Sequence, residues 1–324
     1  MPSPAEQAER IDWPFISVII PTYKREGLLV DTLKDLLSVD YPKYEILVID
    51  QTPSHEPATE NYLRDLSAKG SIRWQRVSKP SLPAARNLGI SLSSGEITVF
   101  IDDDVRLPPG FLKAHARSYL SNPRVGCVAG RIIACEDPSL LPADLLLDRM
   151  PEQVSDPALV WYYHDFTLTR NPQRVLSARG CNMSFRRQIF SEHGLSFDER
   201  FSLVSNREEA DLCLRLRKLG MIVWYDPEAW LRHLEEPSGG CHDESTRTWK
   251  YQINFYRNEF LLGLKNLTPA QCVRFFGRLF ACHVLGRPPC TKSSGSLALV
   301  ARACFYALGF LSALASLTEA SCKA

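Results

Sequence analysis

The chain has 324 residues, which is long for one simple domain and short for several. Its 38 Lys and Arg residues balance 37 Asp and Glu residues, and this balance argues against a nucleic-acid-binding protein, which needs a basic surface. At 45% hydrophobic and 23% charged residues, the composition is that of a globular protein and excludes a disordered or collagen-like chain.

The cysteines and the N-terminus indicate a cytoplasmic protein. Ten cysteines are scattered along the chain without a Cys-x-x-Cys pair, which favours reduced thiols over a disulfide framework. The first 14 residues are polar and contain no apolar signal-peptide core, so we do not expect secretion.

The first third of the chain alternates between buried strands and helices. The apolar patterns and their breaks predict strands at Ile16–Ile20, Ile46–Ile49, Ile72–Val77 and Ile97–Ile101, and helices at Leu28–Leu37, around Leu63–Leu66 and at Pro83–Leu92. Continuous apolar strands between helices predict an α/β fold with a mostly parallel sheet and helices on both faces.

This topology directs attention to the residues that follow the strands. Parallel strands joined by right-handed crossovers end on one edge of the sheet, where open α/β sheets bind their ligands. Thr22 and Arg25, Asp50, and Asp102–Asp104 follow the first, second and fourth predicted strands. We therefore expect them to line one crevice.

The middle of the chain is more mixed, and its last third is helical. Strands are predicted at Val125–Ile133, within Ser177–Phe185 and at Met221–Tyr225, and a helix through Leu212–Leu219 ends at Gly220. Beyond about Pro237 the pattern becomes helical and increasingly apolar.

Three consecutive aspartates at the end of a buried strand suggest a cation site. Successive strand residues point to opposite faces, so Asp102 and Asp104 can point into one crevice while Asp103 points away. Paired carboxylates suit a hard divalent cation that also binds substrate phosphates. The alternative is a polar loop in which Asp104 caps a turn before Pro108.

Seven blocks of the sequence, in their order along the chain, resemble the family 2 glycosyltransferases, which are inverting enzymes with the GT-A fold. The resemblance runs from about residue 15 to residue 260, and its blocks are Phe15–Tyr23, Ile46–Gln51, Ala85–Ile90, Ile97–Pro108, Gly180–Arg187, Phe197–Glu199 and Arg207–Arg215.

The resemblance implies a role for each residue of the crevice. Pro21, Thr22, Tyr23 and Arg25 would line the nucleotide pocket, Asp50 would bind the base, and Arg86, Asn87, Asp102 and Asp103 would also contact the nucleotide sugar. Asp104, Asp102 and His233 would hold Mn²⁺ or Mg²⁺.

Some of these residues also have simpler interpretations. Asp50 could start a turn, Arg86 and Asn87 could lie on a solvated helix face, and His233 could be a structural histidine. The pair Gly239–Gly240 could let the backbone close over phosphates.

The same resemblance implies a catalytic base at Glu209. The family usually has aspartate at this position, and glutamate is longer by one methylene. For Glu208 we predict a capping box with Ser205, and for Asp211 a salt bridge with Arg215, because both spacings favour local helix interactions.

The predicted organisation has four parts. A polar extension covers residues 1–14, a nucleotide-sugar-binding half residues 15–130, an acceptor-binding and catalytic half residues 131–236, and a helical, partly apolar region residues 237–324. The acceptor would contact Leu140–Arg174 and Ser202–Arg207.

Two segments of the last region suggest contact with a membrane. Pro269–Val284 predicts a basic amphipathic helix that carries Arg274 and Arg278. Ser296–Ser316 is long enough to span a bilayer, but Arg302 within it favours a helix that packs on the domain or lies at the inner face of the membrane.

The expected function is therefore glycosyl transfer in cell-surface polysaccharide or glycoconjugate synthesis. The donor would be a nucleotide-diphosphate sugar, UDP by default, and the acceptor a glycan or a lipid-linked molecule. The alternatives are a sugar nucleotidyltransferase, which usually has a Gly-rich loop after its first strand, and a non-catalytic nucleotide-sugar-binding homologue.

Overall fold

The computed structural model describes residues 11–133, 169–201, 203–204, 206–234, 236, 239–240, 248–287 and 296–321. Most of the predicted N-terminal extension, most of the predicted acceptor segment Leu140–Arg174, and Ser205 of the predicted capping box lie outside these residues.

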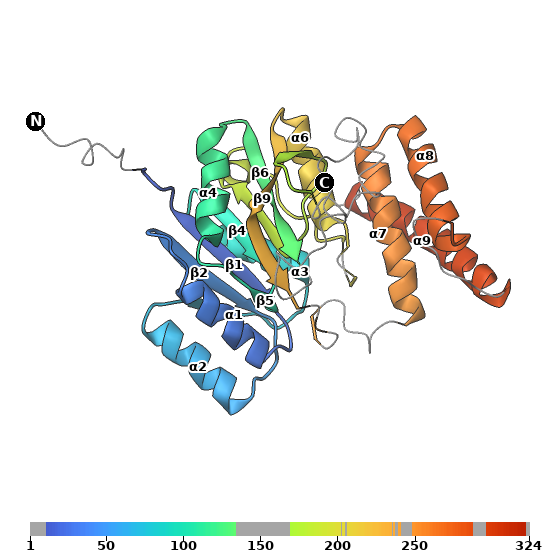
Figure 1. The fold of residues 1–324 in the computed structure, drawn as a ribbon. Coiled ribbons are helices and arrows are strands. Elements are labelled where there is room, and N and C mark those ends of the chain that lie inside the picture. The colour runs from blue at the N-terminus through green and yellow to red at the C-terminus, as the bar shows by residue number, and fades with distance from the viewer. Residues whose placement is uncertain are drawn as a thin grey trace, which may run out of the picture.

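The described strands form one mixed sheet (Figure 1). Its order is β3-β2-β1-β4-β8-β6-β9-β5, with β7 paired to β9. The strands are β1 (Ile16–Thr22), β2 (Tyr44–Asp50), β3 (Arg73–Arg76), β4 (Ile97–Ile101), β5 (Val105–Arg106), β6 (Val125–Ile133), β7 (Gln173–Val175), β8 (Asn182–Arg186) and β9 (Ile222–His233).

The first four strands are parallel, as the sequence predicts. In the second half of the sheet, β8 runs antiparallel to both β4 and β6, and β5 and β7 run antiparallel to β9, whereas β6 and β9 are parallel. The fold class is confirmed as mixed α/β with a mostly parallel central sheet, and the antiparallel additions belong to its second half.

Helices cover both faces of the sheet. On one face lie α1 (Gly27–Leu37), α2 (Pro57–Ala68) and α4 (Phe111–Ser121), and on the other lie α3 (Leu82–Leu92), α5 (Gln188–Ser191) and α6 (Glu208–Lys218). Alternate strand residues supply the two cores: Val18 and Ile20 of β1 pack toward the first group, and Ile19 packs toward the second.

The register of the parallel strands brings the predicted site residues to one edge. Thr22 at the end of β1 is aligned with Asp50 at the end of β2. On its other side β1 pairs with β4, whose last residue directly precedes Asp102. The carboxyl ends of all three strands therefore meet at the same edge, as expected for this topology.

The strand β9 continues to His233, although the sequence predicts an end at Tyr225. Pro227 lies just beyond the predicted end and cannot donate a hydrogen bond to a neighbouring strand. In the structure, the pairing of β9 with β6 shifts register between Gly130 and Ile132, which accommodates this stretch. The continuation carries His233 to the aspartates.

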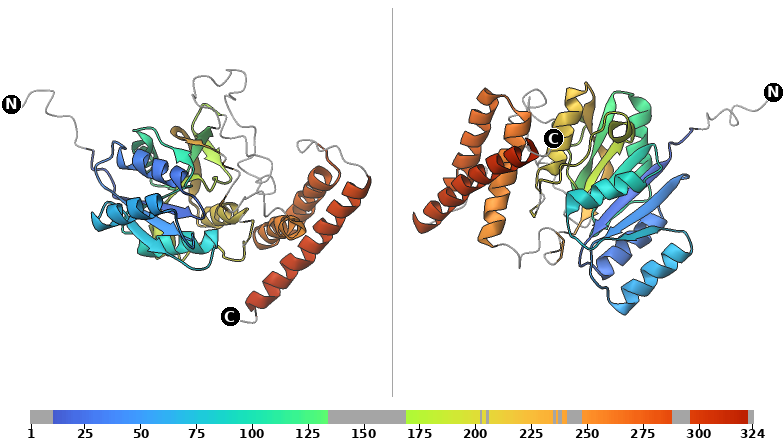
Figure 2. Two further views of the ribbon diagram at one scale, coloured as in Figure 1. Left: turned by 90° about the horizontal axis from the view of Figure 1, so that it is seen from below. Right: turned by 180° about the vertical axis from the view of Figure 1, so that it is seen from behind.

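The C-terminal helices pack beside the sheet domain (Figures 1 and 2). They are α7 (Trp249–Asn266), α8 (Pro269–Leu279), a π-helical turn at Phe280–Val284 and α9 (Ser296–Ser321). Thr268 and Gln271 form a capping box at the start of α8. A third core joins these helices to α6 through Ala210 and Leu214.

The helix α9 packs on α7 by one side only. A Cβ atom added at Gly309 would lie 2.5 Å from the Cβ of Tyr256, so the two helices are in close contact there. The opposite side of α9 faces outward, as Figure 2 shows from two directions. Residues 298–318 are long and apolar enough to cross a membrane, and few of them are buried within the protein.

Candidate functional site

His233 joins two of the three consecutive aspartates. Its Nε2 atom lies 3.7 Å from Oδ2 of Asp102 and 3.2 Å from Oδ1 of Asp104. Although burial alone would lower it, hydrogen bonds to the two carboxylates raise the pKa of His233 to about 10. An imidazolium therefore balances the two carboxylates. The predicted sharing of one crevice by Asp102 and Asp104 agrees with this geometry.

Arg25 binds the remaining carboxylate. Its Nε lies 3.4 Å from Oδ1 of Asp103, and one terminal nitrogen lies 3.3 Å from Oδ2 of Asp104 and 3.2 Å from the carbonyl oxygen of Glu236. Burial raises the pKa of Asp103 to about 7. Asp103 thus lies beneath the site and supports Arg25, and its predicted contact with the nucleotide would act through this guanidinium.

The glycine pair predicted to close over phosphates closes over the loop that follows β1. The amide nitrogen of Gly240 donates to the carbonyl oxygen of Tyr23 at 3.0 Å. Gly239 has φ of 72°, and a Cβ atom there would lie 2.6 Å from the carbonyl oxygen of Lys24. The loop that carries Tyr23 and Arg25 is therefore held by the backbone that follows β9. Gly239 is needed for this close approach, and the positive φ of 67° at Gly240 also favours glycine.

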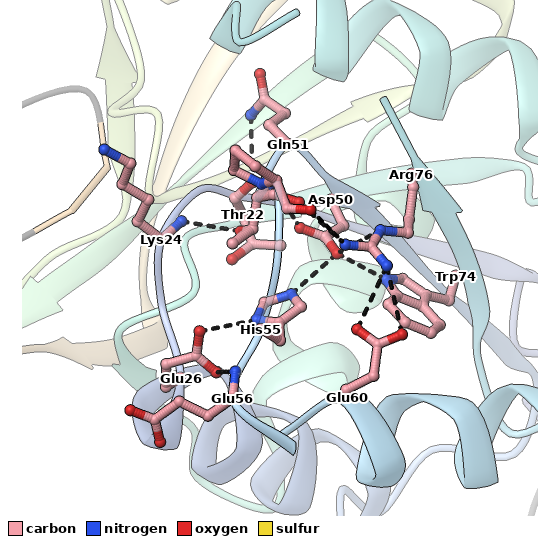
Figure 3. A network of polar contacts seen from close by, with 12 residues as sticks. Thr22, Lys24, Glu26, Asp50, Gln51, His55, Glu56, Glu60, Trp74 and Arg76 are labelled. Atoms are coloured by element: carbon pink, nitrogen blue, oxygen red, sulfur yellow. Dashed lines mark hydrogen bonds and ion pairs between the residues drawn. The ribbon is translucent and has the colours of Figure 1, made fainter. Parts of the chain in front are cut away.

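Asp50 lies inside a polar network at the end of β2 (Figure 3). Its side chain is fully buried, and it accepts hydrogen bonds from the amide of Thr52 at 2.8 Å, from His55 Nε2 at 3.0 Å and from Trp74 Nε1 at 2.9 Å. His55 also contacts Glu26 at 3.0 Å. A donor base that binds Asp50 would share the carboxylate with these protein groups, so the predicted base contact stays a prediction.

Arg86 is buried and connects three elements of the site. Its guanidinium lies 2.5 Å from Oε1 of Glu208 on α6, 3.1 Å from the carbonyl oxygen of Gly180 and 3.9 Å from Oδ1 of Asp102. With 1% of the residue exposed, Arg86 faces protein groups rather than open solution. It therefore ties the start of α6 to the aspartates.

The capping box predicted for Glu208 is wrong. The residue that caps α6 is Arg207, in the left-handed conformation with φ of 77°, and Glu208 is the first residue of the helix rather than the third. Its carboxylate turns inward to Arg86 instead of back to a cap residue. Burial and the charge of Glu209 raise the pKa of Glu208, and Arg86 opposes this shift.

Breaking this buried pair should destabilise the fold. We expect Arg86→Met to lower the free energy of unfolding by about 3 kcal/mol, because an uncompensated buried carboxylate is left behind. This is the low end of the roughly 3–5 kcal/mol that loss of one partner of a buried ion pair costs. We expect the low end because Glu208, whose pKa is already raised, can take up a proton. Urea unfolding followed by tryptophan fluorescence measures the loss.

The control for this variant is Arg64→Met. Arg64 also pairs with a glutamate, Glu60, but its side chain is 67% exposed, so we expect a change within about 0.5 kcal/mol. Equal destabilisation by the two variants would contradict the structural importance of the Arg86–Glu208 pair.

Asn87 holds a neighbouring loop by hydrogen bonds. It donates to the carbonyl oxygen of Phe197 at 2.9 Å and to Glu199 at 3.1 Å, and it accepts from the amide of Phe197 at 2.9 Å. These contacts favour the structural interpretation of Asn87. The nucleotide contact remains a prediction.

The predicted base, Glu209, is half-buried in the first turn of α6, next to Glu208. The turn before it is held from α7: Arg207 Nε donates to the buried Glu259 at 2.8 Å, and Asn258 donates to Asn206 at 3.0 Å. The sequence predicts no role for Asn258 or Glu259. The structure shows that they fix the N-terminal end of α6.

Further along α6, the predicted ion pair is confirmed. A guanidinium nitrogen of Arg215 lies 2.8 Å from Oδ2 of Asp211. Asp211 also accepts from Asn266 and Lys265 of α7, each at 2.8 Å. This pair therefore contributes to helix packing rather than to the crevice.

The residues at the sheet edge fit a divalent cation. Carboxylate oxygens of Asp102 and Asp104 and the Nε2 atom of His233 converge, and Nε2 can bind an ion once the ion displaces its proton. The oxygen ligands suit Mn²⁺ and Mg²⁺, and Mg²⁺ would be held mainly by the two carboxylates. A further donor, the Cys181 sulfur, lies with Asp102 and His233 and was not predicted.

Comparisons with known proteins give a family match and similar folds. The family model described as "Glycosyl transferase family 2" matches residues 17–194. The O-antigen biosynthesis protein RfbC of Myxococcus xanthus is 25% identical over 253 residues, which is 73% of this chain. The chain spans 19% of that relative's length and 28% of another curated relative's length.

Two solved structures share the fold. The structure of Staphylococcus aureus TarS 1-349 in complex with UDP-GlcNAc has a TM-score of 0.61 and 18% sequence identity, over 90% of this chain and 80% of that chain. The mannosyltransferase PcManGT from Pyrobaculum calidifontis, in complex with GDP-Man and Mn²⁺, has a TM-score of 0.50 and 16% identity, over 96% of this chain and 76% of that chain.

Proposed function

The chain belongs to glycosyl transferase family 2, and on this premise we propose that it transfers a sugar from a nucleoside diphosphate to a hydroxyl group with inversion. UDP is the default nucleotide, and the acceptor is a glycan or a lipid-linked molecule of polysaccharide or glycoconjugate synthesis. TarS, which shares the fold, was solved with UDP-GlcNAc, and RfbC is a protein of O-antigen biosynthesis.

One observation carries this proposal: a single chain of contacts joins the aspartates to the start of α6. Arg86 contacts Asp102 on one side and Glu208 on the other, and Glu209 follows directly. A candidate cation site and a candidate base thus belong to one arrangement. Glycosyl transfer needs a positive charge at the leaving diphosphate and a base at the acceptor, and this arrangement would supply both with a cation bound.

On the donor side, Asp102, Asp104 and His233 would hold Mn²⁺ or Mg²⁺. When bound there, the cation neutralises charge that develops on the leaving diphosphate. Arg25 supplies a fixed positive charge beside the same carboxylates. The loop that carries it is held by a backbone hydrogen bond from Gly240 to Tyr23. Pro21, Thr22 and Tyr23 shape the pocket from the same loop and strand.

On the acceptor side, Glu209 would act as the base. Its carboxylate would take the proton of the acceptor hydroxyl as that oxygen forms a bond with the anomeric carbon. The bond from this carbon to the diphosphate oxygen breaks on the opposite side, so the configuration inverts. Glu208, held by Arg86, would orient the first turn of α6.

A thermal-shift panel with nucleoside diphosphates tests the donor assignment. We expect UDP with Mn²⁺ to stabilise the protein by about 2.7 kcal/mol at 100 times its Kd, since it binds the native state alone. UDP without the cation should stabilise it less. An absence of any shift with UDP, GDP or dTDP would contradict the proposal.

The products distinguish the alternatives. Release of the nucleoside diphosphate from a nucleotide sugar supports transfer, whereas exchange of pyrophosphate would show a sugar nucleotidyltransferase. Binding without release in the presence of varied acceptors would identify a non-catalytic homologue.

We further propose that the protein is cytoplasmic and contacts the inner face of the membrane through its C-terminal helices. The outward side of α9 exposes a stripe of apolar residues that includes Val300, Leu308, Leu311 and Leu314. A transmembrane arrangement is disfavoured because Gly309 and the buried Ala313 on the other side of α9 already pack within the protein. Surface contact would place the site near lipid-linked acceptors.

Vesicle sedimentation tests this contact. We expect the protein to sediment with anionic phosphatidylglycerol vesicles, and the double variant Leu308→Asp, Leu311→Asp to lose most of this binding. The control is Leu120→Asp on α4, whose position is similarly exposed but distant from α9 in sequence. Unchanged binding by the double variant would contradict the assigned surface.

A further inference from the structure

We infer that Asp102, Cys181 and His233 form a binding site for a thiophilic divalent cation such as Zn²⁺ or Co²⁺. A carboxylate oxygen, the thiol sulfur and an imidazole nitrogen of these residues all lie within 4.8 Å of one another. The inference adds a sulfur ligand to the cation site of the proposed function. Binding of such an ion is nevertheless measurable whether or not the protein transfers a sugar.

The sheet fixes the backbone of the three residues. β4 and β8 are antiparallel, and the pair formed by Ile101 and Asn182 is the last before Asp102 and Cys181. His233 ends β9, where it is aligned with the first residue of β5. The three donors therefore come from neighbouring, hydrogen-bonded segments, and this arrangement preorganises them for a common ligand.

Both neighbours of Cys181 are also held. The carbonyl oxygen of Gly180 accepts from Arg86 at 3.1 Å, and a Cβ atom at Gly180 would lie 2.5 Å from the same guanidinium. Asn182 is fully buried and donates to the carbonyl oxygens of Arg131 at 2.8 Å and Ala229 at 2.9 Å. The thiol is thus presented at a fixed place.

The separations suit a small tetrahedral ion after modest side-chain rotation. Zinc–sulfur bonds of about 2.3 Å and zinc–nitrogen bonds of about 2.0–2.1 Å place tetrahedral ligands about 3.3–3.6 Å apart. His233 Nε2 already lies 3.7 Å from Asp102 Oδ2. The side chains of Asp102 and His233 are 35% and 21% exposed, so an ion can reach them from solution.

The donor set selects the class of cation. Mg²⁺ prefers oxygen ligands, whereas Zn²⁺ and Co²⁺ bind thiolate, imidazole and carboxylate together, and their binding here releases the protons of the thiol and of the imidazolium to solvent. Three protein ligands leave a fourth position for water or a phosphate oxygen, as in open zinc sites. Because Asp102 and His233 are also assigned to the Mn²⁺ or Mg²⁺ site, a thiophilic ion here would compete with those ions for the same carboxylate and imidazole.

Cobalt titration of the full-length, reduced protein without nucleotide tests the site. We expect a sulfur-to-cobalt charge-transfer band and the visible bands of a tetrahedral ion, saturating at one equivalent, and we expect Zn²⁺ to displace them. Cys181→Ser should abolish the charge-transfer band. Asp102→Asn should lower the Co²⁺ affinity by at least the roughly 10–100-fold that follows loss of a supporting partner.

The matched control is Cys304→Ser, because Cys304 is an exposed cysteine on α9. It should keep the full spectrum.

A second measurement needs no variant. Zn²⁺ should slow the alkylation of Cys181 by iodoacetamide, as measured by mass spectrometry of the peptide, and Mg²⁺ should not. A missing charge-transfer band in the wild type, its persistence in Cys181→Ser, or equal alkylation with and without Zn²⁺ would overturn the inference. Each readout stands apart from sugar transfer.

Discussion

Replacement of Asp104 by asparagine is expected to lower kcat for sugar transfer by at least about 10³-fold. The carboxylate would hold the cation that faces the leaving diphosphate, and such charge stabilisation is worth several kcal/mol, or about three powers of ten in rate. Asparagine keeps the shape of the side chain but not its charge. Steady-state release of the nucleoside diphosphate measures the effect.

The variant should remain folded. Arg25 keeps its contact with Asp103 at 3.4 Å when the charge of Asp104 is removed, so the guanidinium is not left alone. Circular dichroism and the melting temperature check this point. Asp31→Asn is the control, because Asp31 is a half-exposed aspartate paired with Lys34 on α1 and should leave transfer unchanged. Transfer by Asp104→Asn within tenfold of the wild type would refute the cation assignment.

The second large effect is expected for Glu209→Gln, which should reduce kcat by about 10²–10⁴-fold, the usual contribution of a general base. Glutamine has a similar shape but does not accept the proton of the acceptor hydroxyl. The KM for the donor should stay within about twofold, because Glu209 is assigned to the acceptor side. Initial rates at varied donor and acceptor concentrations separate the two parameters.

Two further variants sharpen this test. Glu192→Gln changes an exposed glutamate just after α5 and should behave as the wild type. Glu209→Asp retains the carboxylate, one methylene shorter, and should retain more activity than Glu209→Gln. If Glu209→Gln keeps its kcat, or loses only donor affinity, another group must take the proton.

The elements with the clearest sequence signal are those buried on both faces of the sheet. β4 coincides with the predicted Ile97–Ile101, and β6 with Val125–Ile133, because a continuous β-branched and apolar run has few other stable placements. The edge at which Thr22, Asp50 and Asp102 meet follows from this alternation of strands and helices.

Pairings between distant segments could not be predicted in the same way. An apolar pattern indicates that β8 is buried but does not identify its neighbours, so its antiparallel insertion between β4 and β6 was not expected. The position of Cys181 beside Asp102 depends on that insertion. Arg86 and Glu208, 122 residues apart, likewise meet only through the packing of α3 and α6.

The spacing rules for side chains within one helix predicted the wrong partner for Glu208, because its actual partner is distant in the sequence. The spacing of Ser205 and Glu208 matches a capping box, and the sequence contains no signal that a buried guanidinium lies nearby. The same rules gave the right partner for Asp211, because Arg215 lies one turn away on the same helix.

The core shared by α6 and the C-terminal helices limits how this protein can be divided. A fragment ending at residue 236 would bring Phe201 and Leu214 into contact with water, although both are buried in the intact chain. It would also remove Glu259, the partner of Arg207 at the start of the helix that carries Glu209. Grafting the catalytic half, residues 131–236, onto a foreign nucleotide-binding module would therefore require transplanting α7 together with it.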